Sequence, residues 1–174
     1  MAAAVSSGTP TGPRSLEALR AHLAAYPIKD RPDAAVYVYH AHVHFSLDGE
    51  EPFETASAFK ERLQERFPSS EHYFFGRTHR KPVGPHPVGS YELVFTRPDY
   101  ADVVNFLTFN RPSSLSIFIH PHTFQSLEDH MDRALWLGKP NELVPTVLLN
   151  SEERYSKEME QGKDEAQVLW DHHT

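Results

Sequence analysis

The stretch AAVYVYHAHVHF at residues 34–45 decides how this chain is expected to fold. Its β-branched and aromatic residues and its period-two alternation predict a strand. Alternate side chains of a strand point to opposite faces of the sheet. One face of this strand carries apolar side chains, those of Tyr37, Tyr39, Ala41, Val43 and Phe45. The other face carries three histidines, His40, His42 and His44.

Downstream of this strand the pattern alternates between helices and strands. Apolar residues recur at spacings of three and four over residues 52–67 and again over residues 99–109, which predicts two helices. Short apolar runs predict three further strands, at residues 71–75, 91–95 and 115–120.

A last helix is expected over residues 126–137, because Ser126 and Asp129 resemble a capping box and Gly138 with Pro140 ends the apolar stripe. The order strand, helix, strand, strand, helix, strand, helix is the βαββαβ plan of ferredoxin-like folds with one added element. We therefore predict an α+β, ferredoxin-like antiparallel sheet with an appended C-terminal helix. Two helices should cover the apolar face of the first strand and leave its histidine face open.

The length of 174 residues suits one domain. Residues 1–33 begin with small residues, Ser, Thr, Gly and Pro, and contain a short helical pattern at residues 15–25, so we expect a disordered or short helical extension. The predicted ferredoxin-like domain covers residues 34–149, and residues 150–174 form a polar C-terminal tail.

Composition excludes several classes of function. A net charge of −7 argues against nucleic-acid or anionic-membrane partners, which need a basic face. The absence of cysteine excludes disulfides, thiol nucleophiles and iron–sulfur clusters. No apolar run reaches the ~18 residues that span a bilayer. The N-terminal MAAAVSSGTPTGPRS lacks the apolar segment of a secretory signal, so we expect a cytoplasmic protein.

Histidine is unusually frequent, with 12 in the chain and nine of them between residues 40 and 130. In the expected sheet the first and third strands run parallel and the fourth runs antiparallel to the first. The starts of the first and third strands and the end of the fourth would then meet at one edge. The residues brought together there are His40, His42, His86 and His120.

Such a cluster suits a metal ion, since imidazole is the commonest nitrogen ligand for iron, zinc, copper and manganese. His40 and His42 project from one face ~7 Å apart and reach one ion only if their rings lean together. Otherwise one binds the metal while the other transfers protons or lines the pocket. Glu92 alternates onto the same face and is a possible carboxylate ligand. A hydrogen-bonded structural role is the alternative for each histidine taken alone.

Five segments in a fixed order resemble the DOPA 4,5-dioxygenase family of fungi and their bacterial relatives. They are YHAHVHF (39–45), KPVGPHP (81–87), YELVF (91–95), LSIFIHPHT (115–123) and DHMDRALWLG (129–138). The resemblance covers about residues 35–145. It implies a ferredoxin-like domain, usually dimeric, and a non-haem Fe(II) extradiol dioxygenase. Such an enzyme opens the catechol ring of L-DOPA with O₂, giving seco-DOPAs that lead to betalain or muscaflavin pigments.

The family's histidines fall here on His40, His42, His86, His120 and His130. The chain departs from the family pattern at His44, where Tyr is frequent, and at Thr123-Phe124, where Thr-Gly is frequent. The first departure affects the pocket wall, and the second affects the turn after His120.

Extradiol cleavage needs Fe(II) with three protein ligands, together with a base and an acid near neutral pH. We predict His42, His86 and His120 as ligands, with His40 as the first substitute. Three histidines and two histidines plus Glu92 both stay open as ligand sets. Candidates for proton transfer or for holding the substrate are His40, His44, His122 and His130.

Three loop cations, Arg77, Arg80 and Lys81, could pair with the carboxylate of an amino-acid substrate, although solvation of the loop is the simpler interpretation. The expected partners are a catechol, O₂ and a second copy of the chain, and zinc could occupy the site in isolated protein. The alternatives are a zinc or manganese hydrolase or isomerase on the same histidines, and a non-enzymatic dimeric ferredoxin-like binding module.

Overall fold

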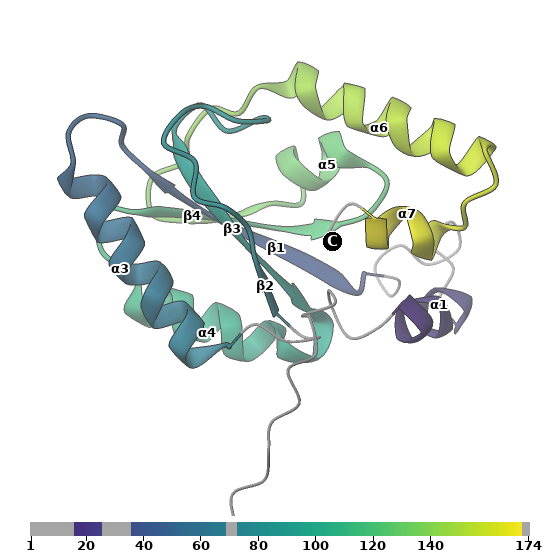
Figure 1. Cartoon of the computed structure of the whole chain (residues 1–174), viewed down its shortest axis with the longest axis horizontal. Helices are drawn as coiled ribbons and strands as arrows, with labels where there is room; N and C mark the ends of the chain where they lie inside the picture. Colours follow the sequence, from purple (N-terminus) through teal and green to yellow (C-terminus); the bar gives the residue numbers. More distant parts are fainter. Residues whose placement is uncertain (1–15, 26–35, 69–72, 172–174) are drawn as a thin grey trace, which may run out of the picture.

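A computed structural model describes residues 16–25, 36–68 and 73–171 (Figure 1). Its centre is a five-stranded sheet in the order β2-β3-β1-β4-β5, with every neighbouring pair antiparallel. The strands are β1 (Val38–Phe45), β2 (Tyr73–Phe75), β3 (Gly89–Thr96), β4 (Ser116–His122) and β5 (Leu135–Leu137). The predicted α+β, ferredoxin-like antiparallel sheet is confirmed, with β5 as an added edge strand.

Helices lie on both sides of this sheet (Figure 1). One side carries α3 (Glu51–Arg66) and α4 (Tyr100–Asn110), the latter preceded by the 3-10 turn η1 (Arg97–Asp99). The other side carries α5 (Ser126–Met131) and α6 (Pro145–Glu160). At one end, α1 (Leu16–Ala25) and α7 (Glu165–Asp171) lie side by side. Within the described ranges, no helix combines the length and the apolar character needed to cross a bilayer.

The main core forms between the apolar face of β1 and the helices α3 and α4. Buried side chains from the three elements make one cluster, which includes Ala41, Val43 and Phe45 of β1, Phe59 and Leu63 of α3, and Val103 and Leu107 of α4. The alternation of residues in β1 therefore predicted this face correctly. Burial of these large side chains is the main source of stability, at about 1.5–3 kcal/mol for each.

The direction of the third strand differs from our expectation. β3 runs antiparallel to β1, with Gly89 opposite Phe45, whereas we expected the two strands to be parallel. The cause lies in the connections: α3 carries the chain back so that β2 runs parallel to β1, and the next connection reverses it into β3. The start of β3 therefore lies beside the end of β1 and not beside its start.

The histidine face of β1 is not open, as we expected, but covered by α5 and α6 (Figure 1). His40 and His42 are each 7% exposed and His44 is 1% exposed. The cover is supplied by the chain after β4, which we had assigned to one helix and a polar tail. Residues 150–160 belong to α6 and residues 165–171 to α7.

The helix expected over residues 126–137 ends at Met131. The N–H groups of Asp132 and Arg133 both donate to the carbonyl of Glu128, 3.0 Å away, which closes the helix. The chain then extends, and Leu135–Leu137 pairs with Ile117–Ile119 of β4. Edge pairing wins here because β4 would otherwise expose its unpaired backbone groups.

At the N-terminal end, α1 agrees with the helix expected at residues 15–25. Residues 1–15, 26–35 and 172–174, on which parts of the predicted extension and tail depend, lie outside the described residues. The predicted domain limits at residues 34 and 149 stay a prediction.

Candidate metal centre

The register of the sheet places three histidines together on the face covered by α5 and α6. His40 of β1 lies directly opposite His120 of β4, and His42 is the next residue of β1 on the same face. One ring nitrogen from each of the three lies within 4.8 Å of the others, and all three side chains are buried. The rings therefore lean together, as two histidines at i and i+2 must if they are to share one ion.

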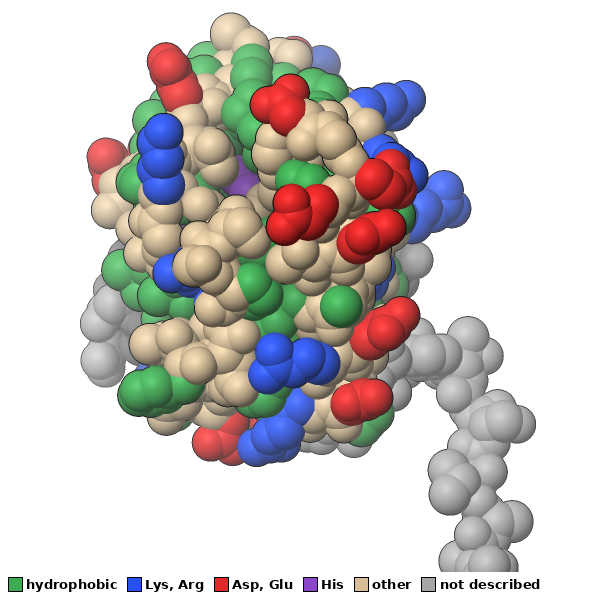
Figure 2. Space-filling model, turned by 90° about the vertical axis from the view of Figure 1, so that its left-hand side faces the viewer, with side chains coloured by type: hydrophobic (Ala, Val, Ile, Leu, Met, Phe, Trp, Pro, Cys, Tyr) green, Lys and Arg blue, Asp and Glu red, His purple; other side chains and the backbone are tan. Residues whose placement is uncertain are grey.

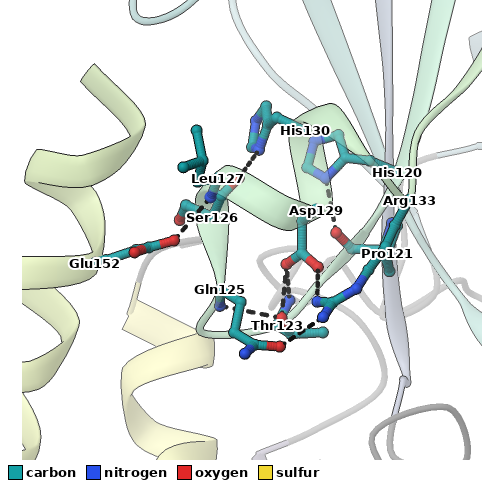
Figure 3. A network of polar contacts seen from close by, with 10 residues as sticks. All are labelled: His120, Pro121, Thr123, Gln125, Ser126, Leu127, Asp129, His130, Arg133 and Glu152. Carbon is teal, nitrogen blue, oxygen red and sulfur yellow. Dashed lines mark hydrogen bonds and ion pairs between the residues drawn. The ribbon is translucent and has the colours of Figure 1, made fainter. Parts of the chain in front are cut away.

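His42 and His120 lie in direct contact across the two strands. Their Nε2 atoms are 3.2 Å apart and their rings are parallel within 3°. His120 Nδ1 lies 2.7 Å from the carbonyl of Pro121 (Figure 3). Because a carbonyl only accepts, this nitrogen carries the proton and Nε2 presents its lone pair. A ligating histidine is commonly oriented in this way.

Burial keeps His42 neutral, as a metal ligand must be. Burial, and then the neighbouring rings of His86, His120, His130 and His44, lower the pKa of His42 well below its usual 6.5. A protonated imidazole has no free lone pair for a metal ion, so a depressed pKa favours metal binding at neutral pH.

His86 reaches the cluster by another route than we expected. It lies in the loop before β3, and a short bridge between Val83 and His86 shapes this loop. Because β3 starts beside the end of β1, His86 Nδ1 lies 3.0 Å from His44 Nε2 and the His86 ring is 4.2 Å from that of His42. Burial lowers the pKa of His44 to about 4 and that of His86 to about 3. His86 is thus in the cluster but outside its set of three convergent nitrogens.

The helix α5 holds His130 against His120, with ring centroids 3.9 Å apart. His130 Nδ1 lies 2.8 Å from the carbonyl of Ser126 (Figure 3), so the Nε2 lone pair of the neutral ring is available. Burial lowers the pKa of His130 to about 4. His130 therefore points from α5 toward the histidines of the sheet.

Asp129 fixes the turn between β4 and α5 (Figure 3). Its Oδ2 accepts from the backbone N–H and from the hydroxyl of Thr123, each at 2.7 Å, and its Oδ1 accepts from Arg133 at 2.9 Å. The carboxylate is 1% exposed as a residue, and burial raises its pKa against these partners. Asp129 thereby holds in place the helix that presents His130.

A cavity of about 180 Å³ adjoins the cluster. Its wall includes His40, His42, His86, His122 and His130, together with Glu92, Arg154 and Tyr155. From the side shown in Figure 2, histidine is visible only as one small recessed area. Glu92 Oε2 lies 3.6 Å from His40 Nδ1, and burial raises the pKa of this carboxyl.

The three loop cations of the sequence prediction separate in the structure. Arg77 lines a neighbouring cavity of about 210 Å³ with His42, His86 and Glu92. Arg80 pairs with Glu50, and Lys81 is exposed and lines neither cavity.

The contribution of α6 to this cavity was not predicted from the sequence. Leu148, Ser151 and Tyr155 line the 180 Å³ cavity, and Arg154 stands beside them. Their spacing of three and four is the signature of one helix face. The charged residues around them led us to expect a solvated tail.

The chain is similar to known proteins over the region that carries these histidines. The model of the Dopa 4,5-dioxygenase family matches residues 39–147. The chain belongs to this family. The match spans every histidine of the cluster, the loop before β3 that carries His86, and the segment between β5 and α6.

Two relatives show how far the similarity extends. The DOPA 4,5-dioxygenase of Amanita muscaria is 33% identical over 109 residues, which is 61% of this chain and 47% of that protein. An uncharacterized 21.2 kDa protein of Botryotinia fuckeliana is 29% identical over 109 residues, 58% of this chain and 57% of that one. The chain therefore spans about half the length of the curated relatives it matches.

A solved structure supports the fold. The crystal structure of a candidate dioxygenase from Nostoc punctiforme superposes with a TM-score of 0.59 and 34% sequence identity, covering 66% of this chain and 93% of that one. Family and relatives support an oxygenase, and the cluster of His40, His42 and His120 can hold a metal ion.

Proposed function

We propose that the protein is an Fe(II)-dependent extradiol dioxygenase that opens the catechol ring of L-DOPA between carbons 4 and 5 with O₂, giving a seco-DOPA. The observation that carries the proposal is the convergence of three buried imidazole nitrogens in a member of the Dopa 4,5-dioxygenase family. A homodimer and a place in betalain-type pigment synthesis belong to the same proposal.

The donor set fits a borderline divalent metal such as Fe(II). Imidazole nitrogen is a preferred ligand of such ions, and the described residues near the cluster include no thiolate to compete. We assign His42 and His120 as two ligands and His40 as the third, in place of His86. The reason is that His86 Nδ1 is engaged with His44 and lies outside the convergent set. Fe(II) at this site would supply the binding of the catechol oxygens and the activation of O₂.

Protein side chains supply the proton transfers. His130 presents a lone pair at Nε2 because its Nδ1–H is held by Ser126, and its pKa of about 4 keeps it unprotonated at neutral pH. We assign it as the base that accepts a catechol proton. His122, which is 8% exposed and packs edge-on to Tyr155, lines the same cavity, and we assign it to positioning the substrate ring.

Two cations line the cavities next to the cluster and could receive the substrate carboxylate. Arg154 belongs to the cavity that contains His40, His122 and His130, whereas Arg77 belongs to the neighbouring one. We assign the carboxylate to Arg154, since its cavity contains more of the proposed ligands and bases. Bidentate pairing of a guanidinium with a carboxylate supplies both affinity and orientation.

The test is reconstitution of the protein with Fe(II) without air, followed by L-DOPA and O₂. We expect one O₂ consumed for each L-DOPA, a yellow product and a mass increase of two oxygen atoms. His42→Ala and His120→Ala should each lower both iron content and turnover by more than ~100-fold, beyond the effect of losing an outer-shell partner. His173→Ala removes a histidine outside the family match and serves as the matched control.

Other outcomes would redirect the proposal. Uptake of O₂ with another catechol keeps the chemistry and changes the substrate. Iron-loaded protein that consumes no O₂ with any catechol contradicts the dioxygenase, and the zinc or manganese hydrolase or isomerase is then tested with those metals. If the wild-type and His120→Ala proteins bind a catechol equally well and neither turns it over, the result supports the non-enzymatic binding module.

A further inference from the structure

Three side chains, those of Asn141, His44 and His86, are joined in series by hydrogen bonds. The series begins at Asn141 and ends at His86, which lines the 180 Å³ cavity. Asn141 Nδ2 lies 3.1 Å from His44 Nδ1, and His44 Nε2 lies 3.0 Å from His86 Nδ1. Asn141 belongs to the segment between β5 and α6, and neither the metal assignment nor the proton transfers above use it. His86 lines both cavities at the cluster.

The chemistry of these groups fixes where the protons lie. An amide nitrogen only donates, so His44 Nδ1 accepts from Asn141. The neutral His44 ring then carries its single proton on Nε2 and donates it to His86 Nδ1. His86, accepting at Nδ1, carries its own proton on Nε2. The direction of every bond in the series therefore follows from the orientation of one amide.

Separate contacts hold both ends of this series. The N–H of Val144 donates to the carbonyl of Pro85 at 2.9 Å, which ties the segment of Asn141 to the loop of His86. Between them, the His44 ring stands edge-on to Trp136 with centroids 5.5 Å apart. Buried rings packed in this way cannot turn to exchange their nitrogens without disturbing the segment around them.

We propose that Asn141 is a positioning residue that sets the tautomers of His44 and His86, so that His86 offers an N–H, and not a lone pair, to the cavity. In the reaction proposed above, on which this second part rests, His86 is a hydrogen-bond donor to an oxygen of the bound reactants. His120 and His130 have the opposite tautomer, because a backbone carbonyl holds the Nδ1 proton of each. The site therefore combines lone pairs from β4 and α5 with a donor from the loop before β3.

The tautomers can be measured directly by long-range ¹H–¹⁵N correlation spectra of metal-free protein labelled with ¹⁵N-histidine, at about pH 8. His44→Gln and His86→Gln proteins assign the two signals. We expect the proton on Nε2 in His44 and His86, and on Nδ1 in His120 and His130. This readout does not depend on metal, substrate or turnover, so it separates a failure of this inference from a failure of the proposed function.

The decisive variant is Asn141→Asp, which keeps the shape but can only accept. We expect the His44 proton to move to Nδ1 and the His86 proton to follow to Nδ1, while His120 and His130 stay unchanged. Asn105→Asp makes the same chemical change on α4, across the sheet, and should alter none of the four. In protein that turns over a catechol, Asn141→Asp should lower kcat by about 10–100-fold with a smaller change in KM.

Two results would overturn the inference. One is a wild-type spectrum with the His86 proton on Nδ1, which needs no variant and decides the question even if Asn141→Asp does not fold. The other is an Asn141→Asp protein that is folded but keeps all four tautomers. A merely structural role for Asn141 would lower stability without moving any ring proton.

Discussion

The two faces of β1 are built from alternate residues of one strand and are almost equally buried, yet one buries apolar side chains and the other buries imidazole rings. Val43 is 0% exposed and packs in the core with Phe59 and Leu63 of α3. His42 is 7% exposed and is surrounded by other imidazoles. Apolar burial stabilises the fold, whereas burial of polar rings is unfavourable unless every ring is hydrogen-bonded. We therefore expect the histidine face to contribute less to the free energy of unfolding than the apolar face does.

Acid should expose this difference most strongly in the metal-free protein. His44 and His130 have folded pKa values of about 4, and His86 of about 3, against about 6.5 when unfolded. Between pH 6.5 and 4 the unfolded chain therefore binds more protons, and stability falls as the pH falls. Each such histidine contributes about 1.4 kcal/mol per pH unit. We expect urea denaturation with chelator present to show the steepest loss of unfolding free energy in this window.

Two buried carboxyls, Glu92 and Asp129, have the opposite effect on the pH dependence of stability. Burial raises the pKa of Glu92 and Asp129, so the folded state takes up their protons first and the loss is partly offset at the acid end. His130→Gln removes one titrating ring and should reduce the slope by about 1.4 kcal/mol per pH unit. A free energy of unfolding that stays constant from pH 6.5 to 4.5 would contradict the neutral, buried state of the cluster.

A matched pair of substitutions tests the two faces separately. Phe59→Ala empties a fully buried site in the apolar core and should lower the unfolding free energy by about 3–5 kcal/mol. His42→Leu replaces a buried imidazole with an apolar side chain of similar size and should change it by less than about 1.5 kcal/mol. The effects on Fe(II) binding should be opposite to those on stability. Folded Phe59→Ala protein should still bind Fe(II), and His42→Leu protein should not.

Urea denaturation and anaerobic Fe(II) titration, made on the same samples, check both halves of this pair. A loss of stability in His42→Leu as large as that of Phe59→Ala would mean that the histidine face also stabilises the fold. Phe59→Ala protein that is folded yet binds no Fe(II) would mean that the two faces are not independent.

Alternation was enough to predict the two faces from the sequence, because a strand has only two sides and the residue types of β1 separate cleanly. The helices α3 and α4 were also predicted, because their apolar residues recur at spacings of three and four and so lie on one face. Strand direction is a property of the connections and not of the strand's own residues, so β3 was placed in the wrong direction. The cover of the histidine face was missed because α6 carries its apolar residues in a strongly charged segment.

The sequence predicted that the histidines meet, but not the route by which they do so. His40, His42 and His120 depend only on register between neighbouring strands, which the alternation of residues limits strongly. His86 depends on the path of a loop rich in Gly and Pro, whose contacts with His44 and with the segment before α6 are long-range. Residue type alone marks His86 as part of a site, but its tautomer depends on Asn141, 55 positions further along the chain.

The smallest effect on metal binding is expected from a substitution of Glu92, the residue that distinguishes a ligand set of three histidines from one of two histidines and a carboxylate. Glu92 Oε2 lies 3.6 Å from His40 Nδ1, beyond hydrogen-bond distance but close enough for a small shift to let the carboxylate orient this ring as an outer-shell partner. Glu92→Gln should therefore weaken Fe(II) binding by about 10–100-fold, the effect of an outer-shell partner, while the fold is retained or slightly stabilised. Glu61→Gln on the exposed face of α3 is the matched control. A loss as complete as that of His42→Ala would instead assign the carboxylate as a ligand in place of His40, because a ligand supplies the metal bond itself whereas an orienting group only shapes it.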